Sequence, residues 1–424
     1  MMINATIKIN YKILIQCCLV YILLTMDGSF LFSLNENAFK MGILFVSVVL
    51  FAYNAKYRDM KIIMTLAFLL ISIIFVRQIN HGGIGMDVWI LFASQMLIAF
   101  LAVYYRRDTF IEVYIKVVYF LAVISLISWI IALINPNILK PFLSANVAVN
   151  YDNSIFYGKL FFVIHNNNTR NVGIYPEPGV YQIALNMALY LLLFYGHKAN
   201  FTKKQTIHYL MTFILTLLSA QSTSGYLSMM AVLLGFAVSR HRWEMENRRI
   251  KRYILIVAAL LLCILMIDYN IQGEDSLISR IVLQKLFSGN RFDLSSSTGK
   301  YRVESIRISM DSIINNPLGQ GYDYLNMVKR YAKLEAVGNG LLSTIAALGV
   351  IPMLVILYRM LIPIFKYGAS KIAFLIFVFM FVNTTLAQTY VFYPSFFMLT
   401  FLAYSQKECE LSYEMDEFLE FQKI

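Results

Sequence analysis

The sequence predicts an all-α polytopic membrane protein: one integral membrane domain over residues 1–424, with about twelve transmembrane helices. Hydrophobic residues make up 59% of the chain and charged residues 14%, whereas an ordinary soluble domain has about 45–50% and 25%. The apolar residues gather in segments of about 20, the length that crosses a bilayer. Short basic loops separate many of these segments.

The apolar segments predict where the chain crosses the membrane. The predicted spans are 12–32, 38–54, 60–78, 86–104, 114–134, 178–196, 206–221, 222–239, 253–269, 339–358, 371–386 and 390–405. Lys8 and Lys12 precede the first span as in a signal peptide, but no small-residue cleavage site follows, so we expect an uncleaved span. The polar break Gln221 to Gly225 makes 206–239 either a tight hairpin or one bent span.

The distribution of charge predicts the orientation. The net charge of +12 does not indicate a nucleic-acid partner, because the basic residues lie in short loops on one side of the membrane, as cytoplasmic loops do. These residues are Lys56, Arg58, Lys61, Arg106, Arg107, Lys198, Lys203, Lys204, Arg240, Arg242, Arg248, Arg249, Lys251 and Arg252. Both termini are then cytoplasmic, with a solvated acidic tail over 406–424. An outer loop (135–177) and a large outer loop (270–338) are extracytoplasmic.

The cysteine and histidine residues predict neither a disulfide nor a metal site. Three cysteines lie in apolar spans and Cys409 lies in the tail, without zinc-ligand spacing. His81 and His165, the only outward histidines, also lack metal-ligand spacing. No nucleotide-binding loop precedes a helix. We therefore expect no cofactor.

The large outer loop contains the sequence YRVESIRISMDSIINNPLGQGY, residues 301–322. Its apolar residues recur at helical spacing, which predicts an amphipathic helix over 301–315. Pro317, Gly319 and Gly321 are expected to end it. We expect the apolar stripe to lie on the bilayer surface or over the mouth of a cavity between spans. The members of the stripe are Val303, Ile306, Met310, Ile313 and Ile314.

The outer loop before the span 178–196 ends in RNVGIYPEPG, residues 170–179. Pro176 and Pro178 restrict the backbone on both sides of Glu177, and Gly173 permits a close approach by chain or ligand. Two explanations remain open for the charges. Arg170 pairs with Glu177 or with headgroups, or it is a clamp for an anion, because guanidinium binds phosphate through two hydrogen bonds.

The outer-loop helix offers two further arginines. Arg302 is placed in the predicted first turn, where a bound anion would relieve its conflict with the helix dipole. Arg307 has Glu304 and Asp311 at helical spacing, so a surface ion pair is its more ordinary role. Tyr175 and Tyr301 are candidates to stack on sugar rings. The basic residues Lys300, Lys329, Arg330 and Lys333 add positive charge that suits anionic lipid or an anionic substrate.

Three stretches together resemble the O-antigen polymerase and O-antigen ligase superfamily, over about residues 165–360. RNVGIYPEPGVYQIAL is similar to the family's segment entering a mid-chain span, and STSGYLSMMAVLLG to its Ser/Thr-rich break. YRVESIRISMDSIINNPLGQGYD, followed by VGNGLLSTIAALGVIPML, is similar to its outer-loop helix, turn and next span. Two positions depart from the pattern: Gly338 stands where ligases tend to have a histidine, and Gly225 stands where an arginine often follows Ser224. The missing histidine favours the polymerase branch.

The resemblance implies a surface-polysaccharide polymerase (O-antigen, capsule or another exopolysaccharide) in the bacterial cytoplasmic (inner) membrane. It would transfer a glycan from undecaprenyl diphosphate to a lipid-linked repeat unit without a metal. Arg170 and Arg302 would stabilise the leaving diphosphate, and Glu177 would orient or deprotonate the acceptor hydroxyl. Substrate-binding candidates are Gly173, Tyr175, Pro176, Pro178, Ser224, Tyr301, Arg307, Gly319, Gly321 and Asn339.

The partners that this function implies are the lipid-linked oligosaccharide, the lipid bilayer, a flippase and a chain-length regulator. Three alternatives stay open: a ligase that moves finished polymer, a flippase or other transporter, and a purely structural membrane partner. Transport is less favoured than a ligase, because the chain has no internal repeat and its basic residues lie in loops.

Overall fold

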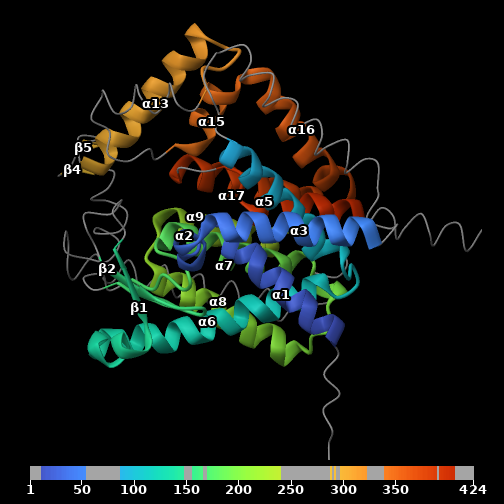
Figure 1. The fold of residues 1–424 in the computed structure, drawn as a ribbon, viewed down its shortest axis with the longest axis vertical. Helices are drawn as coiled ribbons and strands as arrows, with labels where there is room; N and C mark the ends of the chain where they lie inside the picture. Colours follow the sequence, from blue (N-terminus) through green and yellow to red (C-terminus); the bar gives the residue numbers. More distant parts are fainter. Residues whose placement is uncertain are drawn as a thin grey trace, which may run out of the picture.

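The computed structural model describes residues 11–53, 86–147, 155–165, 170–239, 287–288, 291–292, 297–321, 339–388 and 391–405 (Figure 1). Within these residues the chain is mostly helical, as predicted, and carries two small antiparallel sheets. Helices occupy each predicted span in this part of the chain. The predicted spans 60–78 and 253–269 and the tail 406–424 lie outside the described residues.

The structure gives the following bounds. The α-helices are α1 (Tyr11–Met26), α2 (Phe30–Leu34), α3 (Glu36–Tyr53), α5 (Met86–Tyr104), α6 (Phe110–Ile134), α7 (Pro178–Phe194), α8 (Lys203–Ala220), α9 (Thr223–Val238), α13 (Ser297–Asn315), α15 (Gly340–Leu348), α16 (Val350–Tyr367) and α17 (Lys371–Ala387), with a last helix over Pro394–Ser405. The strands are β1 (Ser144–Val147), β2 (Ile155–Gly158), β3 (Val163–His165), β4 (Phe287–Ser288) and β5 (Arg291–Phe292).

The apolar helices fit a membrane protein. Among the described residues, α6 and α16 are long and apolar enough to cross a bilayer. Shorter apolar helices lie over Tyr11–Met26, Ile90–Tyr104, Pro178–Phe194, Thr223–Val238, Lys371–Ala387 and Pro394–Ser405. Large apolar side chains are also exposed along α3, α6 and α16, including Phe45, Ile130 and Ile351, as surfaces in contact with lipid require.

Helix α7 forms the centre of the fold. All its residues from Gly179 to Phe194 are buried. It packs against α6 and α8 on one side and against α9 and α17 on the other, and α15 follows beyond α17 (Figure 1). Such an all-round buried helix is expected to be apolar on every face. Its two exceptions, Gln182 and Asn186, therefore need internal partners.

Two predicted spans are interrupted. The 206–239 stretch forms two helices, α8 and α9, separated at Gln221, whose backbone is left-handed (φ 50°). The predicted span 339–358 is broken at Gly349 (φ 92°), and its second part, α16, continues to Tyr367. The first predicted span is also shorter than expected, because α1 ends at Met26 and a turn separates it from α2.

The segment 135–177 contains a small sheet that the sequence analysis did not predict. Strands β1, β2 and β3 form an antiparallel sheet in which Ser144 pairs with Gly158 and Phe156 with His165. The Val163 N–H donates to the Gly173 carbonyl (2.6 Å), and the Phe30 N–H donates to the Ile174 carbonyl (3.0 Å). The sheet, α2 and the segment 170–177 are thus joined through backbone hydrogen bonds.

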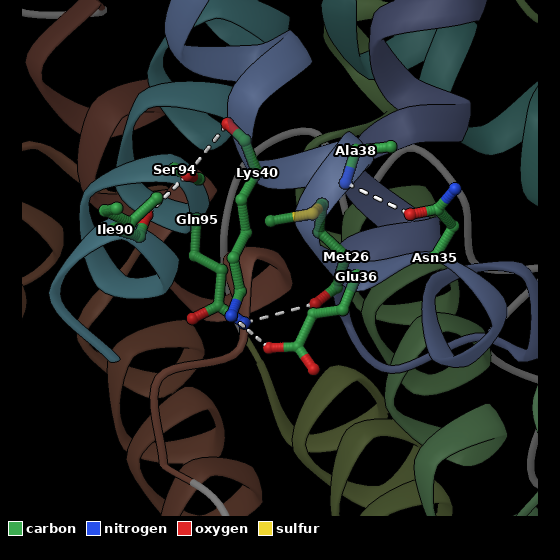
Figure 2. Close-up of polar contacts among 8 residues, drawn as sticks. All are labelled: Met26, Asn35, Glu36, Ala38, Lys40, Ile90, Ser94 and Gln95. Atoms are coloured by element: carbon green, nitrogen blue, oxygen red, sulfur yellow. Dashed lines mark hydrogen bonds and ion pairs between the residues drawn. The ribbon is translucent and has the colours of Figure 1, made fainter. Parts of the chain in front are cut away.

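A buried lysine lies where α1, α3 and α5 meet. Lys40 is 4% exposed and pairs with Glu36, one turn earlier on α3. Figure 2 shows Lys40 extending alongside Gln95, whose amide donates to the Met26 carbonyl (3.2 Å). Lysine is rarely buried unless it is paired, so Glu36 accounts for its position. Sequence analysis did not single out Lys40.

Candidate active site

The segment 170–177 is held rigidly at the start of α7. The Asn171 amide donates to Ser125 Oγ on α6 (3.2 Å) and to Ser219 Oγ on α8 (3.0 Å). Gly173 has a positive φ of 60°, and a Cβ there would lie 2.6 Å from the Tyr181 ring. The Tyr175 hydroxyl donates to the Leu24 carbonyl (3.0 Å). This buried hydroxyl holds α1, so Tyr175 is placed as an anchor and not as a platform for sugar.

Arg170 and Glu177 lie at the two ends of this rigid segment, and both are partly exposed. The Arg170 guanidinium is close enough to the Tyr226 hydroxyl on α9 to act on it electrostatically. Glu177 is the N-cap residue of α7, with Pro178 at the first helical position, and its side chain makes no capping hydrogen bond. Pro176 precedes it and is partly exposed.

The start of α9 lies directly against the first turn of α7. Ser222 caps α9 through the Gly225 N–H (3.3 Å), and the Ser224 carbonyl accepts from the Asn383 amide of α17 (2.7 Å). A Cβ on Gly225 would lie 2.8 Å from Gln182 Cβ. The departure from the family pattern at Gly225 therefore has a packing reason: the close approach of α7 leaves no room for a side chain.

The start of α15 lies against α7 from another side. The Gly340 N–H donates to the Gln388 carbonyl (2.6 Å), and the Gln388 amide lies over Gly179, 2.0 Å from where a Cβ would be. Asn339 caps α15 by accepting from the Leu342 N–H (3.2 Å). Asn339 is 0% exposed, and its Nδ2 has no hydrogen-bond partner.

The N-termini of α7 and α9 meet around Gly179 and Gln182, and the N-terminus of α15 reaches Gly179 through Gln388. Each N-terminus carries a partial positive charge. Their meeting favours an anion at this place. Glu177, Ser224 and Asn339 lie on these helix starts or immediately before them, and Arg170 lies near Tyr226 in the first turn of α9, so the structure brings four of the predicted site residues into one region.

A polar network lies beneath this region, and sequence analysis missed it. The Asn186 amide donates to Gln182 Oε1 (2.8 Å) and to the Gly225 carbonyl (3.1 Å), and the Gln182 amide contacts Thr384 of α17 (3.5 Å). The Asn383 amide also donates to Ser228 Oγ (2.9 Å). The available signal was polar residues inside apolar segments, which mark bundle-facing positions.

Helix α13 confirms the predicted amphipathic helix but begins earlier than predicted. It begins at Ser297, so Arg302 is not in the first turn, and the dipole argument for Arg302 is wrong. The side chains of Tyr301 and Arg302 lie outside the described part. The face that packs on α15 contains the buried residues Ser305, Ser309 and Ser312. The apolar stripe at Val303, Ile306, Met310 and Ile314 is exposed; in the described part of the chain it covers no cavity.

Arg307 lies on the exposed side of α13, 3.9 Å from both Glu304 and Asp311. This is the surface ion pair that the sequence predicted. With its side chain 70% exposed, such a pair adds little stability.

The turn after α13 is docked into the break between α15 and α16. The Gln320 and Gly321 N–H groups donate to the carbonyls of Ala346 and Ala347 (2.9 and 3.0 Å), and the Val350 N–H donates to the Pro317 carbonyl (2.9 Å). Gly319 and Gly321 have positive φ angles. The two glycines predicted as substrate contacts are therefore parts of a backbone joint that satisfies the last carbonyls of α15.

No group of three or more His, Cys, Asp or Glu residues with metal-binding geometry occurs within the described ranges. The site geometry instead offers fixed donors: helix N-termini, an arginine and buried amides. The class defined by fold and site is a helical membrane protein with an anion-attracting region where helix starts meet. Residues 208–357 match the family model described as O-antigen ligase.

This match covers 150 of the 424 residues and supports the resemblance of the chain to the O-antigen polymerase and ligase superfamily, whose members are glycosyl-transfer enzymes acting on lipid-linked polysaccharide in a membrane. The predicted resemblance is confirmed over these residues. The segment RNVGIYPEPG lies before the matched range. No curated protein and no solved structure matches the chain.

Proposed function

We propose that this protein is a polymerase of bacterial surface polysaccharide. It transfers a growing glycan from undecaprenyl diphosphate to the terminal sugar of a lipid-linked repeat unit at the outer face of the cytoplasmic membrane. The observation that supports this proposal is the meeting of three helix N-termini beside Arg170 and Glu177. A lipid diphosphate is the leaving group of this reaction, and its departure requires fixed positive charge.

The proposed roles follow from position. Arg170 and Arg302 stabilise the negative charge that develops on the departing diphosphate oxygen. The role of Arg302 is proposed from the sequence resemblance. Glu177, which is partly exposed at the start of α7, accepts the proton of the attacking sugar hydroxyl. The glycosidic bond forms at the sugar carbon as its bond to diphosphate breaks.

A ligase is the second candidate, because the matched family model bears that description. Gly338 in place of the ligase histidine favours the polymerase. A flippase is less well supported, because Lys40, the buried lysine of α3, is already paired with Glu36.

The experiment that tests the proposal is the glycan profile of cells lacking the protein, followed by reaction of the purified protein with a lipid-linked repeat unit. A polymerase leaves lipid with a single repeat unit in the deletion strain and makes longer glycans in detergent. Full-length polymer left on lipid indicates a ligase. A protein that makes no glycosidic bond while moving the substrate across vesicles is a transporter. Either result contradicts the proposal.

A further inference from the structure

Two buried polar atoms without partners lie between α13 and α15. Only five buried side-chain N or O atoms lack a hydrogen bond among the described residues, and two of them are Ser305 Oγ and Asn339 Nδ2. Both residues are 0% exposed. A buried polar group without a partner is costly, so each such atom needs an explanation.

The packing of the two helices brings these atoms to the same level. Ser309 Oγ lies 3.3 Å from Ser343 Oγ, and further along both helices Ile313 packs on the pair Ala346 and Ala347. The helices therefore run side by side in the same direction (Figure 1). One turn back from Ser309 is Ser305, and one turn back from Ser343 is Asn339.

Asn339 Nδ2 and the Ser305 hydroxyl are both able to donate hydrogen bonds. The Asn339 Oδ1 atom already accepts from the Leu342 N–H, so Nδ2 is the atom of this amide that lacks a partner. Nδ2 can only donate, and the Ser305 hydroxyl can donate beside it. The N-terminus of α15 adds partial positive charge. Two donors and a helix N-terminus match a negatively charged oxygen.

We propose that Ser305 and Asn339 form a subsite for a phosphate oxygen of the lipid-linked diphosphate. This inference rests on the proposed function, which supplies the diphosphate, and it adds Ser305 to the substrate-contacting residues. In the absence of substrate the two buried donors have no acceptor, and a bound phosphate oxygen would supply it.

The chain offers a matched control for the test. Ser305 and Ser309 are both 0% exposed and on the same face of α13, but Ser309 has a partner. Binding of undecaprenyl diphosphate to the purified protein in nanodiscs should weaken about tenfold in Ser305→Ala, since a hydrogen bond to a charged group is lost. Asn339→Asp should weaken it further, because a carboxylate repels phosphate. Ser309→Ala should bind within about twofold of the wild type.

Thermal unfolding without ligand separates binding from folding. Ser305→Ala should not lower the melting temperature, because it removes an unsatisfied hydroxyl, whereas Ser309→Ala should lower it by removing a hydrogen bond. If Ser305→Ala binds undecaprenyl diphosphate as tightly as the wild type, the subsite is wrong. A water molecule would then be the partner of the Ser305 hydroxyl. A loss confined to sugar-bearing lipid, with bare undecaprenyl diphosphate bound normally, would overturn the phosphate assignment.

The two proposals fail separately. If the wild type binds undecaprenyl diphosphate with the expected variant pattern but never extends the repeat unit, the polymerase function is wrong and the subsite stands. If the wild type extends it and Ser305→Ala binds and extends equally well, only the subsite is wrong.

Discussion

Asp27 and Ser395 lie 368 residues apart in the sequence and are joined by two hydrogen bonds. The Asp27 carboxylate accepts from the Ser395 N–H (3.2 Å) and from its hydroxyl, and both residues are buried. Ser395 is in the first turn of the last helix, so the carboxylate also lies at a positive helix end. This contact joins the first helix of the described chain to the last.

Asp27→Ala should therefore lower the free energy of unfolding by about 3 kcal/mol, because it leaves two buried donors without an acceptor. Thermal unfolding of the purified protein in detergent would measure this. Asp27→Asn should lose less, since its amide oxygen still accepts. Asp108→Ala is the control: that carboxylate is exposed and pairs with Arg106, so a change of similar size there would contradict the argument.

Gly349→Ala should disrupt the joint between the outer loop and α16. At this position φ is +92°, and a Cβ would lie 2.5 Å from the Leu318 carbonyl oxygen. Gly321→Ala has a similar φ (+79°) but open space around it, so it should cost only the backbone strain of about 1–2 kcal/mol. We expect a larger loss of thermal stability in Gly349→Ala. Equal losses would show that the contact with Leu318 is unimportant.

Gly225→Ala should force α7 and α9 apart, because its Cβ would lie 2.8 Å from Gln182 Cβ. We expect a destabilised protein with reduced glycan extension. In contrast, Gly42→Ala on α3 meets nothing within 4 Å and should be neutral or stabilising by about 0.5–1 kcal/mol. Wild-type stability and activity in Gly225→Ala would refute the packing explanation for glycine at this position.

Arg170→Ala and Arg302→Ala should each reduce glycan extension by about 100- to 1,000-fold, the usual effect of removing a donor to a developing oxyanion. Lysine at either position should restore only part of the rate, because it lacks the paired donors of guanidinium. The assay is polymer length from a purified lipid-linked repeat unit. The exposed Lys204 of α8 is the control, and its alanine variant should extend normally. If either arginine variant makes polymer of normal length, that arginine has no role in the mechanism.

Glu177→Gln should slow extension by about 100- to 10,000-fold, the contribution of a general base. The rate of the wild type should fall at acid pH as the carboxylate is protonated, and this acid limb should be missing in the glutamine variant. Thermal unfolding of the glutamine variant separates a loss of catalysis from a loss of folding. A glutamine variant with the wild-type rate across pH would exclude Glu177 as the base.

The sequence predicted most helices because helix signals are local. The bounds of α5 agree with the predicted span 86–104, and the predicted ends of α13 at Pro317 and of α17 near residue 386 agree within two residues. The sheet β1–β3 was missed because its pairs, such as Ser144 with Gly158, join residues far apart in a segment rich in Asn and Tyr. No local pattern specifies such pairing.

Only the part of the site that depends on local sequence signals was predicted. The segment 170–177 was recognisable by its prolines and charges, whereas the contacts of Gln388 with Gly340 and Gly179 depend on how distant helices meet. The face of α13 that packs on α15 was not predicted, because the sequence analysis considered only the apolar stripe of this helix. Small residues allow membrane helices to approach closely, and the serines face α15 for that reason.

The joint between the turn 316–321 and the broken helix has a practical consequence for protein engineering. The amide hydrogens of Gln320 and Gly321 complete a helix that begins 19 residues further on, at Gly340. A chimera that exchanges the outer loop between two such proteins should therefore carry residues 297–367 as a single cassette. A graft cut between 321 and 339 would separate the two halves of one connection.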